Sequence, residues 1–213
     1  MNTVETIRQV LMNQQPDKET GMLEIINASF IADQESIFGT VNYDYVRREI
    51  DWYLSRSLNV NDIEGEVPSI WKSVATPEGR INSNYGWCVF SEANGQQFLK
   101  AVNALIGDKH SRQAVMIYNR PSMHEDSKKD GMHDFMCTHS AHLIIRNDEL
   151  HYMVNMRSND AVFGYKNDRA WHQYIWNQAF RSLLKNYENL KQGKMYWNAG
   201  SLHVYPRHAH LVK

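Results

Sequence analysis

The chain has 213 residues, of which 42% are hydrophobic and 22% are charged, and its formal net charge is −1. This composition is typical of a globular protein and excludes a disordered chain. The charge provides no basic field for nucleic acid, and no apolar run approaches the roughly 20 residues that cross a membrane. We therefore expect one domain, residues 1–213, with no direct contact to nucleic acid or membrane.

Redox chemistry and the start of the chain indicate where the protein acts. Two cysteines and ten methionines are typical of a protein in a reducing compartment rather than of a disulfide scaffold. The first residues alternate polar and apolar side chains at helical spacing and lack the apolar run of a signal peptide. We expect a cytoplasmic protein.

The first half of the chain predicts helices around one strand. Apolar spacing predicts a helix over residues 4–11 and a strand over residues 21–33 with a break near Asn27. A strongly amphipathic pattern predicts a helix over residues 43–58. Residues 61–86 are rich in Gly, Pro, Asn and Ser, which predicts mostly loop. A second helix fits Gln96 to Ile106 and ends at Gly107.

The second half predicts mainly strands. Residues 113–120 have a strand pattern, residues 121–134 form a polar connection, and two further strands, 135–146 and 149–158, are joined at Asn147-Asp148 as a hairpin. A long helix is expected over residues 170–193, with Asn167 or Asp168 as its N-cap and Gly193 as its stop. Residues 194–212 are expected as strand. The pattern predicts an α+β fold with a mixed or mostly antiparallel sheet.

Cys137 is the most informative of the two cysteines, because His133, His139 and His142 flank it. If residues 135–145 form a strand, Cys137 and His139 share a face and His142 points the other way, so a metal site is disfavoured. A buried strand cysteine is the default interpretation. The remaining alternative is a nucleophile, which needs nearby positive charge to form a thiolate at neutral pH.

Other polar groups can be interpreted in two ways. Arg112 and Arg157 are candidates for the positive charge near the thiol. Residues 155–168 combine an Arg-Ser pair with Asp and Gly, which suits an anion site or a simple strand end with a capped helix. His203 and Tyr205 lie on one strand face, where they suit a sugar hydroxyl or an ordinary sheet edge. Glu49 lies at the border of an apolar stripe, where it is either a desolvated acid or a solvated side chain.

Seven segments, in order from about Glu24 to the end, resemble the thymidylate synthase superfamily, and within it the deoxycytidylate hydroxymethylases of phages. They are "SFIAD…FG", "REIDWY", "IW" followed by "INSNYGW", "SRQAVMIYNRPSM", "DGMHDFMCT", "VNMRSNDAVFGYKNDRAW" and "GSLHVYPRH". The resemblance implies a three-layer α/β fold around a large kinked mixed sheet, and a homodimer that pairs sheet to sheet. It also implies the host cytoplasm if a phage encodes the chain, and membership of a nucleotide-synthesis complex.

The resemblance implies a role for each matching residue. By position these are Cys137 as the nucleophile that adds to C6 of the pyrimidine, Arg157 and Ser158 as phosphate ligands, Arg112 as a ligand to the phosphate of the neighbouring subunit, His203 and Tyr205 as ligands to the deoxyribose 3′-hydroxyl, Glu49 as the residue that organises water and protons, Tyr85 as a tyrosine near the nucleophile, and Trp71, Asp160 and Gly164 as folate-side positions. The co-substrate implied is 5,10-methylenetetrahydrofolate, with no metal.

Asp168 is the most discriminating position, because thymidylate synthases place Asn there. Cytosine offers an amino donor at N4 and an acceptor at N3. A carboxyl group that holds one proton can satisfy both atoms. The resemblance therefore implies hydroxymethylation of deoxycytidylate (dCMP), by addition of Cys137, one-carbon transfer to C5 and attack of a water that Glu49 positions.

Some positions depart from the family pattern. Gln113 stands where relatives commonly carry a second arginine, His142 stands where they carry glutamine, and the segment after Tyr205 is short where relatives have a tail that closes over folate. These departures keep open the alternatives of another substrate, dUMP or CMP, and of a nucleotide-binding homologue without catalysis.

Overall fold

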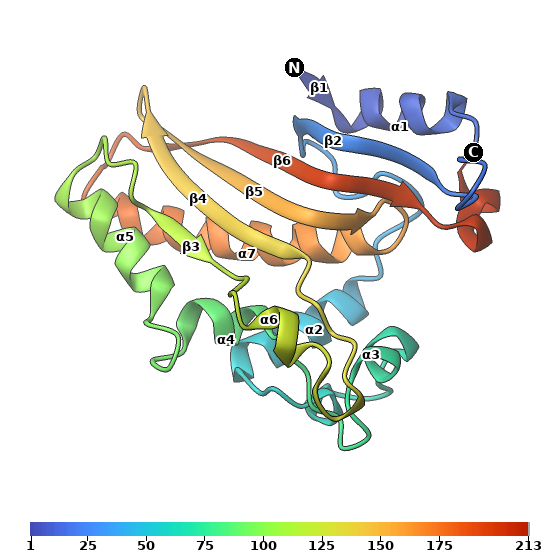
Figure 1. The fold of residues 1–213 in the computed structure, drawn as a ribbon. Coiled ribbons are helices and arrows are strands. Elements are labelled where there is room, and N and C mark those ends of the chain that lie inside the picture. Colours follow the sequence, from blue (N-terminus) through green and yellow to red (C-terminus); the bar gives the residue numbers. More distant parts are fainter. Residues whose placement is uncertain (213) are drawn as a thin grey trace.

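A six-stranded mixed sheet organises the computed structural model, which describes residues 1–212 (Figure 1). Its strand order is β1-β2-β6-β5-β4-β3. The strands are β1 Asn2–Thr3, β2 Leu23–Ile31, β3 Val115–Ile117, β4 Thr138–Arg146, β5 Glu149–Asp160 and β6 Lys191–Val204. β5 and β6 pair in parallel, β1 and β2 also pair in parallel, and the other neighbours are antiparallel. The predicted α+β class with a mixed sheet is confirmed.

The helices cover one face and one end of this sheet (Figure 1). They are α1 Val4–Asn13, α2 Tyr43–Ser55, α3 Ser69–Val74, α4 Tyr85–Phe90, α5 Gln97–Gly107, α6 Met123–Asp126 and α7 Gly164–Leu184, with 3₁₀ turns at Val60–Asp62, Lys129–Gly131 and Pro206–Leu211. α5 and α7 lie on one face, where α7 buries Trp171, Ile175 and Leu183. α1 packs on β1 and β2 at that edge of the sheet. Within residues 1–212, no helix is long and apolar enough to cross a membrane.

Two local predictions are confirmed by backbone geometry. Asn147 and Asp148 both have positive φ, 52° and 59°, as a two-residue hairpin turn with a right-handed strand twist requires. Asn27 interrupts β2 with a φ of 54°, and the pairing of β2 with β6 omits it. Asn tolerates this left-handed conformation better than most residues.

Residues 61–86 are mostly loop, as predicted, but the prediction omits two short helices. α3 begins directly after Pro68, and α4 begins at Tyr85. The Asn84 side chain caps α4 by accepting from the Trp87 N–H at 2.7 Å. Gly86 lets this helix approach α2, since a Cβ there would lie 1.9 Å from the Tyr53 carbonyl oxygen. Tertiary packing therefore stabilises helices whose length and composition favour a loop.

The boundaries of the long helix were also predicted wrongly. α7 begins at Gly164, so Asn167 and Asp168 lie inside it rather than at its N-cap. It ends at Leu184, and Gly193 belongs to β6, where a Cβ would lie 2.5 Å from His151 Nδ1. The glycine therefore marks a close approach to β5 and not a helix stop.

Strand ends near the cysteine differ from the prediction as well. β4 begins at Thr138, so Cys137 precedes the strand. The pairing of β4 with β5 shifts register between Thr138 and Ser140, which interrupts the alternation of faces assumed for Cys137 and His139. The last strand also ends earlier than expected, at Val204, and residues 206–211 form a 3₁₀ turn.

Candidate active site

Cys137 lies at the start of β4, in contact with an arginine from β5. Arg157 Nη2 is 3.6 Å from Cys137 Sγ. The guanidinium is fixed by the carbonyl oxygens of Phe135, at 2.6 Å, and Met136, at 3.1 Å. Burial raises the pKa of the Cys137 thiol to about 11, and Arg157 opposes that rise only in part. The expected cation is present, but the free thiol is protonated at neutral pH.

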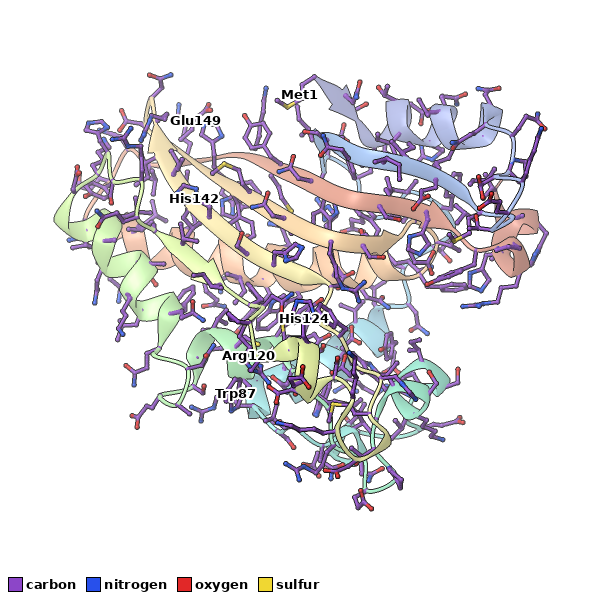
Figure 2. The ribbon with its side chains drawn as sticks, viewed as in Figure 1. Met1, Trp87, Arg120, His124, His142 and Glu149 are labelled. Atoms are coloured by element: carbon purple, nitrogen blue, oxygen red, sulfur yellow. The ribbon has the colours of Figure 1, made fainter. Side chains whose placement is uncertain are left out.

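The segment before Cys137 is held by a buried carboxyl group. Asp134 accepts hydrogen bonds from the backbone N–H groups of Asn82 and Ser83, both at 2.7 Å, and from the Ser83 hydroxyl at 2.6 Å. Figure 2 shows Trp87, Arg120 and His124 gathered beneath the start of β4, where the Arg120 guanidinium lies 5.9 Å from the Trp87 ring. These contacts fix the backbone that precedes Cys137, and with it the position of the thiol.

Asp168 faces the same region from the first turns of α7. Its Oδ1 accepts from the Tyr85 hydroxyl at 3.3 Å, and its Oδ2 accepts from Asn159 Nδ2 at 2.8 Å. Burial, with the Glu49 charge next in size, raises the pKa of Asp168 to about 8. Asp168 and Cys137 also raise the pKa of the buried Tyr85. The carboxyl group is therefore protonated at neutral pH.

A tryptophan fixes the orientation of Asn159. The indole Nε1–H of Trp197 donates to Asn159 Oδ1 at 3.2 Å. Because an indole can only donate, Asn159 must present its amino group to Asp168. The amide N–H at Oδ2 can only donate, so Oδ2 must be a bare acceptor, whereas the Tyr85 hydroxyl at Oδ1 can donate or accept. The proton of the carboxyl group is therefore favoured on Oδ1. The asymmetry matches the demand of cytosine for one donor and one acceptor.

A second buried carboxyl group, Glu49, lies on α2. Its Oε1 accepts from the Tyr45 hydroxyl and from Trp71 Nε1, the latter at 3.0 Å. Glu49 is 5% exposed, and burial raises its pKa. Within residues 1–212, Oε2 makes no hydrogen bond to another side chain. This oxygen can hold a water molecule or a substrate proton.

The predicted phosphate and sugar ligands lie on adjacent strands. The parallel register of β5 and β6 pairs Ser158 with Ser201 and Asp160 with His203. The rings of His203 and Tyr205 are 4.7 Å apart. Arg157 and Ser158 therefore share one end of the sheet with His203.

Arg112 lies away from this group. Val115 pairs with His142 in the middle of β4, so Arg112 lies toward the Arg146 end of that strand, whereas Cys137 precedes its other end. Burial lowers the pKa of His142, which Figure 2 labels on β4, and the Arg112 backbone opposes this shift in part. The structure does not bring Arg112 to the thiol of its own chain.

The predicted folate-side residues adjoin the two carboxyl groups. A Cβ on Gly164 would lie 3.3 Å from Asn159 Nδ2 and 3.6 Å from Asp168 Oδ2, so glycine keeps space beside the carboxyl group. Asp160 accepts from the Val162 N–H at 2.9 Å. The adjoining apolar side chains are unusually exposed: Ile70, beside Trp71, by 59% and Phe163 by 45%. A carboxylate together with exposed apolar surface fits a folate.

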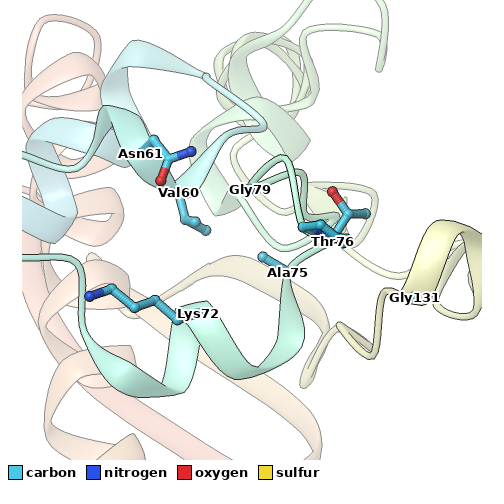
Figure 3. Close-up of a pocket in the computed structure, with 8 residues that line it drawn as sticks. Val60, Asn61, Lys72, Ala75, Thr76, Gly79 and Gly131 are labelled. Carbon is cyan, nitrogen blue, oxygen red and sulfur yellow. The ribbon is translucent and has the colours of Figure 1, made fainter.

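Other features lie outside this group. Within residues 1–212, no three His, Cys, Asp or Glu side chains converge as a metal site would require. Figure 3 shows an open pocket of about 380 Å³ lined by Val60, Asn61, Lys72, Ala75, Thr76, Pro77, Gly79 and Gly131. None of the predicted site residues lines it.

Comparison with known proteins identifies the family. A sequence model described as thymidylate synthase matches residues 7–213. The chain belongs to the thymidylate synthase family. It is 49% identical over 192 residues to the deoxycytidylate 5-hydroxymethyltransferases of Enterobacteria phages T4 and T2, which covers 89% of this chain and 78% of each relative. It is 24% identical over 177 residues to a thymidylate synthase of Francisella tularensis subsp. holarctica, which covers 78% of this chain and 63% of that enzyme.

Five residues that contact the candidate site residues were not predicted from the sequence. They are Tyr45, Asn159, Trp197, Ser201 and Glu24. Tyr45 precedes Glu49 by one helical turn, and Ser201 precedes His203 on one strand, so spacing offered a weak signal for these two. Asn159, Trp197 and Glu24 are brought in by strand pairing, which local spacing does not reveal.

Proposed function

We propose that this member of the thymidylate synthase family converts dCMP, a one-carbon unit and water into 5-hydroxymethyl-dCMP, in the cytoplasm. The one-carbon unit is supplied by 5,10-methylenetetrahydrofolate, for which Trp71, Asp160 and Gly164 are the proposed contacts. The similarity to phage deoxycytidylate 5-hydroxymethyltransferases supports this reaction. The observation that carries the choice of base is the carboxyl group of Asp168, held between Tyr85 and Asn159 with its pKa raised by burial to about 8.

Asp168 supports cytosine over uracil through the direction of its hydrogen bonds. A protonated Oδ1 donates to the N3 acceptor of cytosine, and the bare Oδ2 accepts from the N4 amino group. Uracil presents the opposite pattern, N3–H and O4, so the proton would have to move to the oxygen that faces Asn159. The Trp197–Asn159 pair opposes that exchange.

The other proposed roles follow from charge and position. Cys137 attacks C6, and the proton of Asp168 on N3 withdraws the electrons that this addition places in the ring. Arg157 and Ser158 bind the phosphate. After C5 receives the one-carbon unit, loss of the C5 proton and of tetrahydrofolate leaves an exocyclic methylene on the ring. Glu49 orients the water that adds to this carbon as the new hydroxyl group, and expulsion of Cys137 restores the ring. Tyr85 contacts Asp168 and packs on Tyr53 at a ring distance of 5.2 Å, so it buttresses the carboxyl group.

Release of tritium from C5-labelled nucleotides tests this proposal. We expect release from dCMP, and little from dUMP or CMP, in the presence of methylenetetrahydrofolate. Cys137→Ala should abolish release, whereas Cys88→Ala should retain it, because Cys88 is fully buried in the core. Persistent release by Cys137→Ala would refute the covalent mechanism. Absence of release from all three nucleotides would favour a nucleotide-binding protein without catalysis.

We also propose that two chains pair through the sheet face opposite α5 and α7. Half-buried side chains of mixed polarity, including His142, Met153, Asn155 and Tyr196, lie between fully buried neighbours along β4, β5 and β6. Such partial burial suits an interface. The location of Arg112, away from the thiol of its own chain, supports a role for it in the partner's site.

Mixed dimers distinguish this role from one within a single chain. Arg112→Ala and Cys137→Ala should each be inactive, but a dimer of the two restores one complete site if Arg112 serves the partner. Unfolding and refolding the two variants together should therefore recover activity. A mixture of Asp168→Ala with Cys137→Ala is the control, because both residues act within one chain. Failure of the first mixture, with dimers present by sedimentation, would contradict the proposed role.

A further inference from the structure

Three side chains form a hydrogen-bonded row along β2 and β6, beside the proposed sugar site. The Ser201 hydroxyl donates to the Glu24 carboxylate, and Ser201 Oγ lies 3.2 Å from Nδ1 of His203. The strand register places Glu24 opposite His203. His203 is 5% exposed, and its Nε2 is buried without a hydrogen-bond partner in residues 1–212. A buried nitrogen without a partner is costly unless a ligand supplies one.

The row has a fixed direction. A carboxylate only accepts hydrogen bonds, so the single hydroxyl proton of Ser201 points to Glu24. Ser201 Oγ then presents a lone pair to His203, which must donate from Nδ1–H. Burial lowers the pKa of His203, so its ring is neutral at neutral pH and carries one N–H only. Nε2 is therefore a bare acceptor.

We propose that Glu24 and Ser201 are positioning residues that fix the tautomer of His203, so that Nε2 accepts the 3′-hydroxyl proton of the nucleotide. This inference rests on the proposed function, which supplies the nucleotide. The Tyr205 ring lies 4.7 Å from the His203 ring, and its phenol can donate to the same 3′-oxygen. The hydrogen bonds then run in one direction, from Tyr205 through the sugar hydroxyl, His203 and Ser201 to Glu24, and successive bonds strengthen one another.

The consequence is selection for a hydroxyl group that can donate. A nucleotide without a 3′-hydroxyl would leave Nε2 buried and unpaired, which costs more than the loss of one ordinary hydrogen bond. A substitution that reverses the row would place the proton on Nε2, so that Nε2–H and the Tyr205 phenol would both donate to the 3′-oxygen and the hydroxyl proton would lose its acceptor, which weakens this selection. Glu24→Gln permits the reversal, because the amide of glutamine can donate to Ser201 where a carboxylate cannot.

Nitrogen NMR of histidine-labelled protein measures the tautomer without any ligand. We expect His203, assigned by its loss in His203→Gln, to carry its proton on Nδ1 in the wild-type protein and to shift toward Nε2–H in Glu24→Gln. Ser201→Ala should weaken the preference for Nδ1–H as well. An Nε2–H tautomer in the wild-type protein would overturn the inference. Failure of nucleotide binding would refute the proposed function but leave this measurement intact.

Calorimetric binding of dCMP and of 2′,3′-dideoxycytidine monophosphate tests the link to the sugar. We expect the wild-type protein to prefer dCMP by about tenfold or more, and Glu24→Gln to lose most of that preference through weaker binding of dCMP alone. Glu35→Gln is the matched control, since Glu35 also accepts from a hydroxyl, that of Tyr43 at 2.6 Å, but on the surface. The proposal would be overturned if Glu24→Gln kept the wild-type preference for dCMP, or if it bound both nucleotides more weakly by the same factor.

Discussion

Replacing Asp168 by Asn should make the stability of the protein less sensitive to pH. The pKa of Asp168 rises from 3.8 in the unfolded chain to about 8 in the folded protein, chiefly through burial. The folded pKa is the higher one, so the stability linked to this group is complete below about pH 4 and is lost as pH rises through about 8. At about 1.4 kcal/mol per pH unit, the loss amounts to about 4 kcal/mol at pH 7.

Urea unfolding of the wild-type protein and Asp168→Asn at pH 5 and pH 8 checks this magnitude. The advantage of the variant in free energy of unfolding should grow by about 4 kcal/mol between the two pH values. Asp126→Asn is the control: Lys129 and Ser122 lower the pKa of Asp126 to about 2, so that carboxyl group stays ionised in both states over this range. An advantage for Asp168→Asn that is equal at pH 5 and pH 8 would refute the reasoning.

Three further changes test other contacts. Arg157→Lys should slow alkylation of Cys137 by iodoacetamide at pH 8 by about tenfold, because the shorter lysine ammonium cannot hold both backbone carbonyls and the sulfur, and a more distant cation raises the thiol pKa. An unchanged rate would exclude Arg157 as the group that lowers the thiol pKa. Tyr45→Phe removes one of two donors to Glu49. The kcat for product formation should therefore fall by about tenfold with little change in KM, while tritium release persists. Equal loss of product formation and tritium release would contradict a role of Glu49 in hydration. Gly86→Ala should destabilise the fold by more than about 3 kcal/mol in thermal unfolding, because its Cβ would meet a backbone oxygen at 1.9 Å. Gly107→Ala is the control and should be neutral, because a Cβ at that position would have no atom within 4 Å.

Sequence patterns predicted those elements whose signals are local. The hairpin at Asn147-Asp148 needs two residues that tolerate positive φ, and both are present. The break at Asn27 rests on the same property. By contrast, α3 and α4 are six residues each, too short for periodicity to register, and depend on caps and contacts that form only in the folded chain. The pattern left a mixed and a mostly antiparallel sheet open, and the resemblance to the thymidylate synthase superfamily favoured the mixed one.

The residues of the candidate site also divide into those that local motifs reveal and those that strand pairing brings together. Cys137, Arg157 and Asp168 were found because family motifs surround them. The groups that set their chemistry come from other strands: Trp197 orients Asn159 across β5 and β6, and Glu24 meets Ser201 across β2 and β6. Strand pairing depends on the whole sheet, so no local spacing predicts it. The sequence alone also left the charge state of the thiol undecided, because burial decides it.

The protonation of Asp168 links base recognition to the nucleophile. A charged Asp168 is one of the two carboxylates that raise the pKa of Cys137. When Asp168 holds its proton, that contribution is absent and Arg157 acts on the sulfur with less opposition. In the proposed mechanism, the proton that satisfies N3 of cytosine therefore also favours the thiolate that attacks C6. Uracil cannot accept this proton at N3, so Asp168 must either move it to the oxygen that faces Asn159 or lose it. Loss would place a carboxylate beside the sulfur and raise the pKa of Cys137, so both outcomes disfavour uracil.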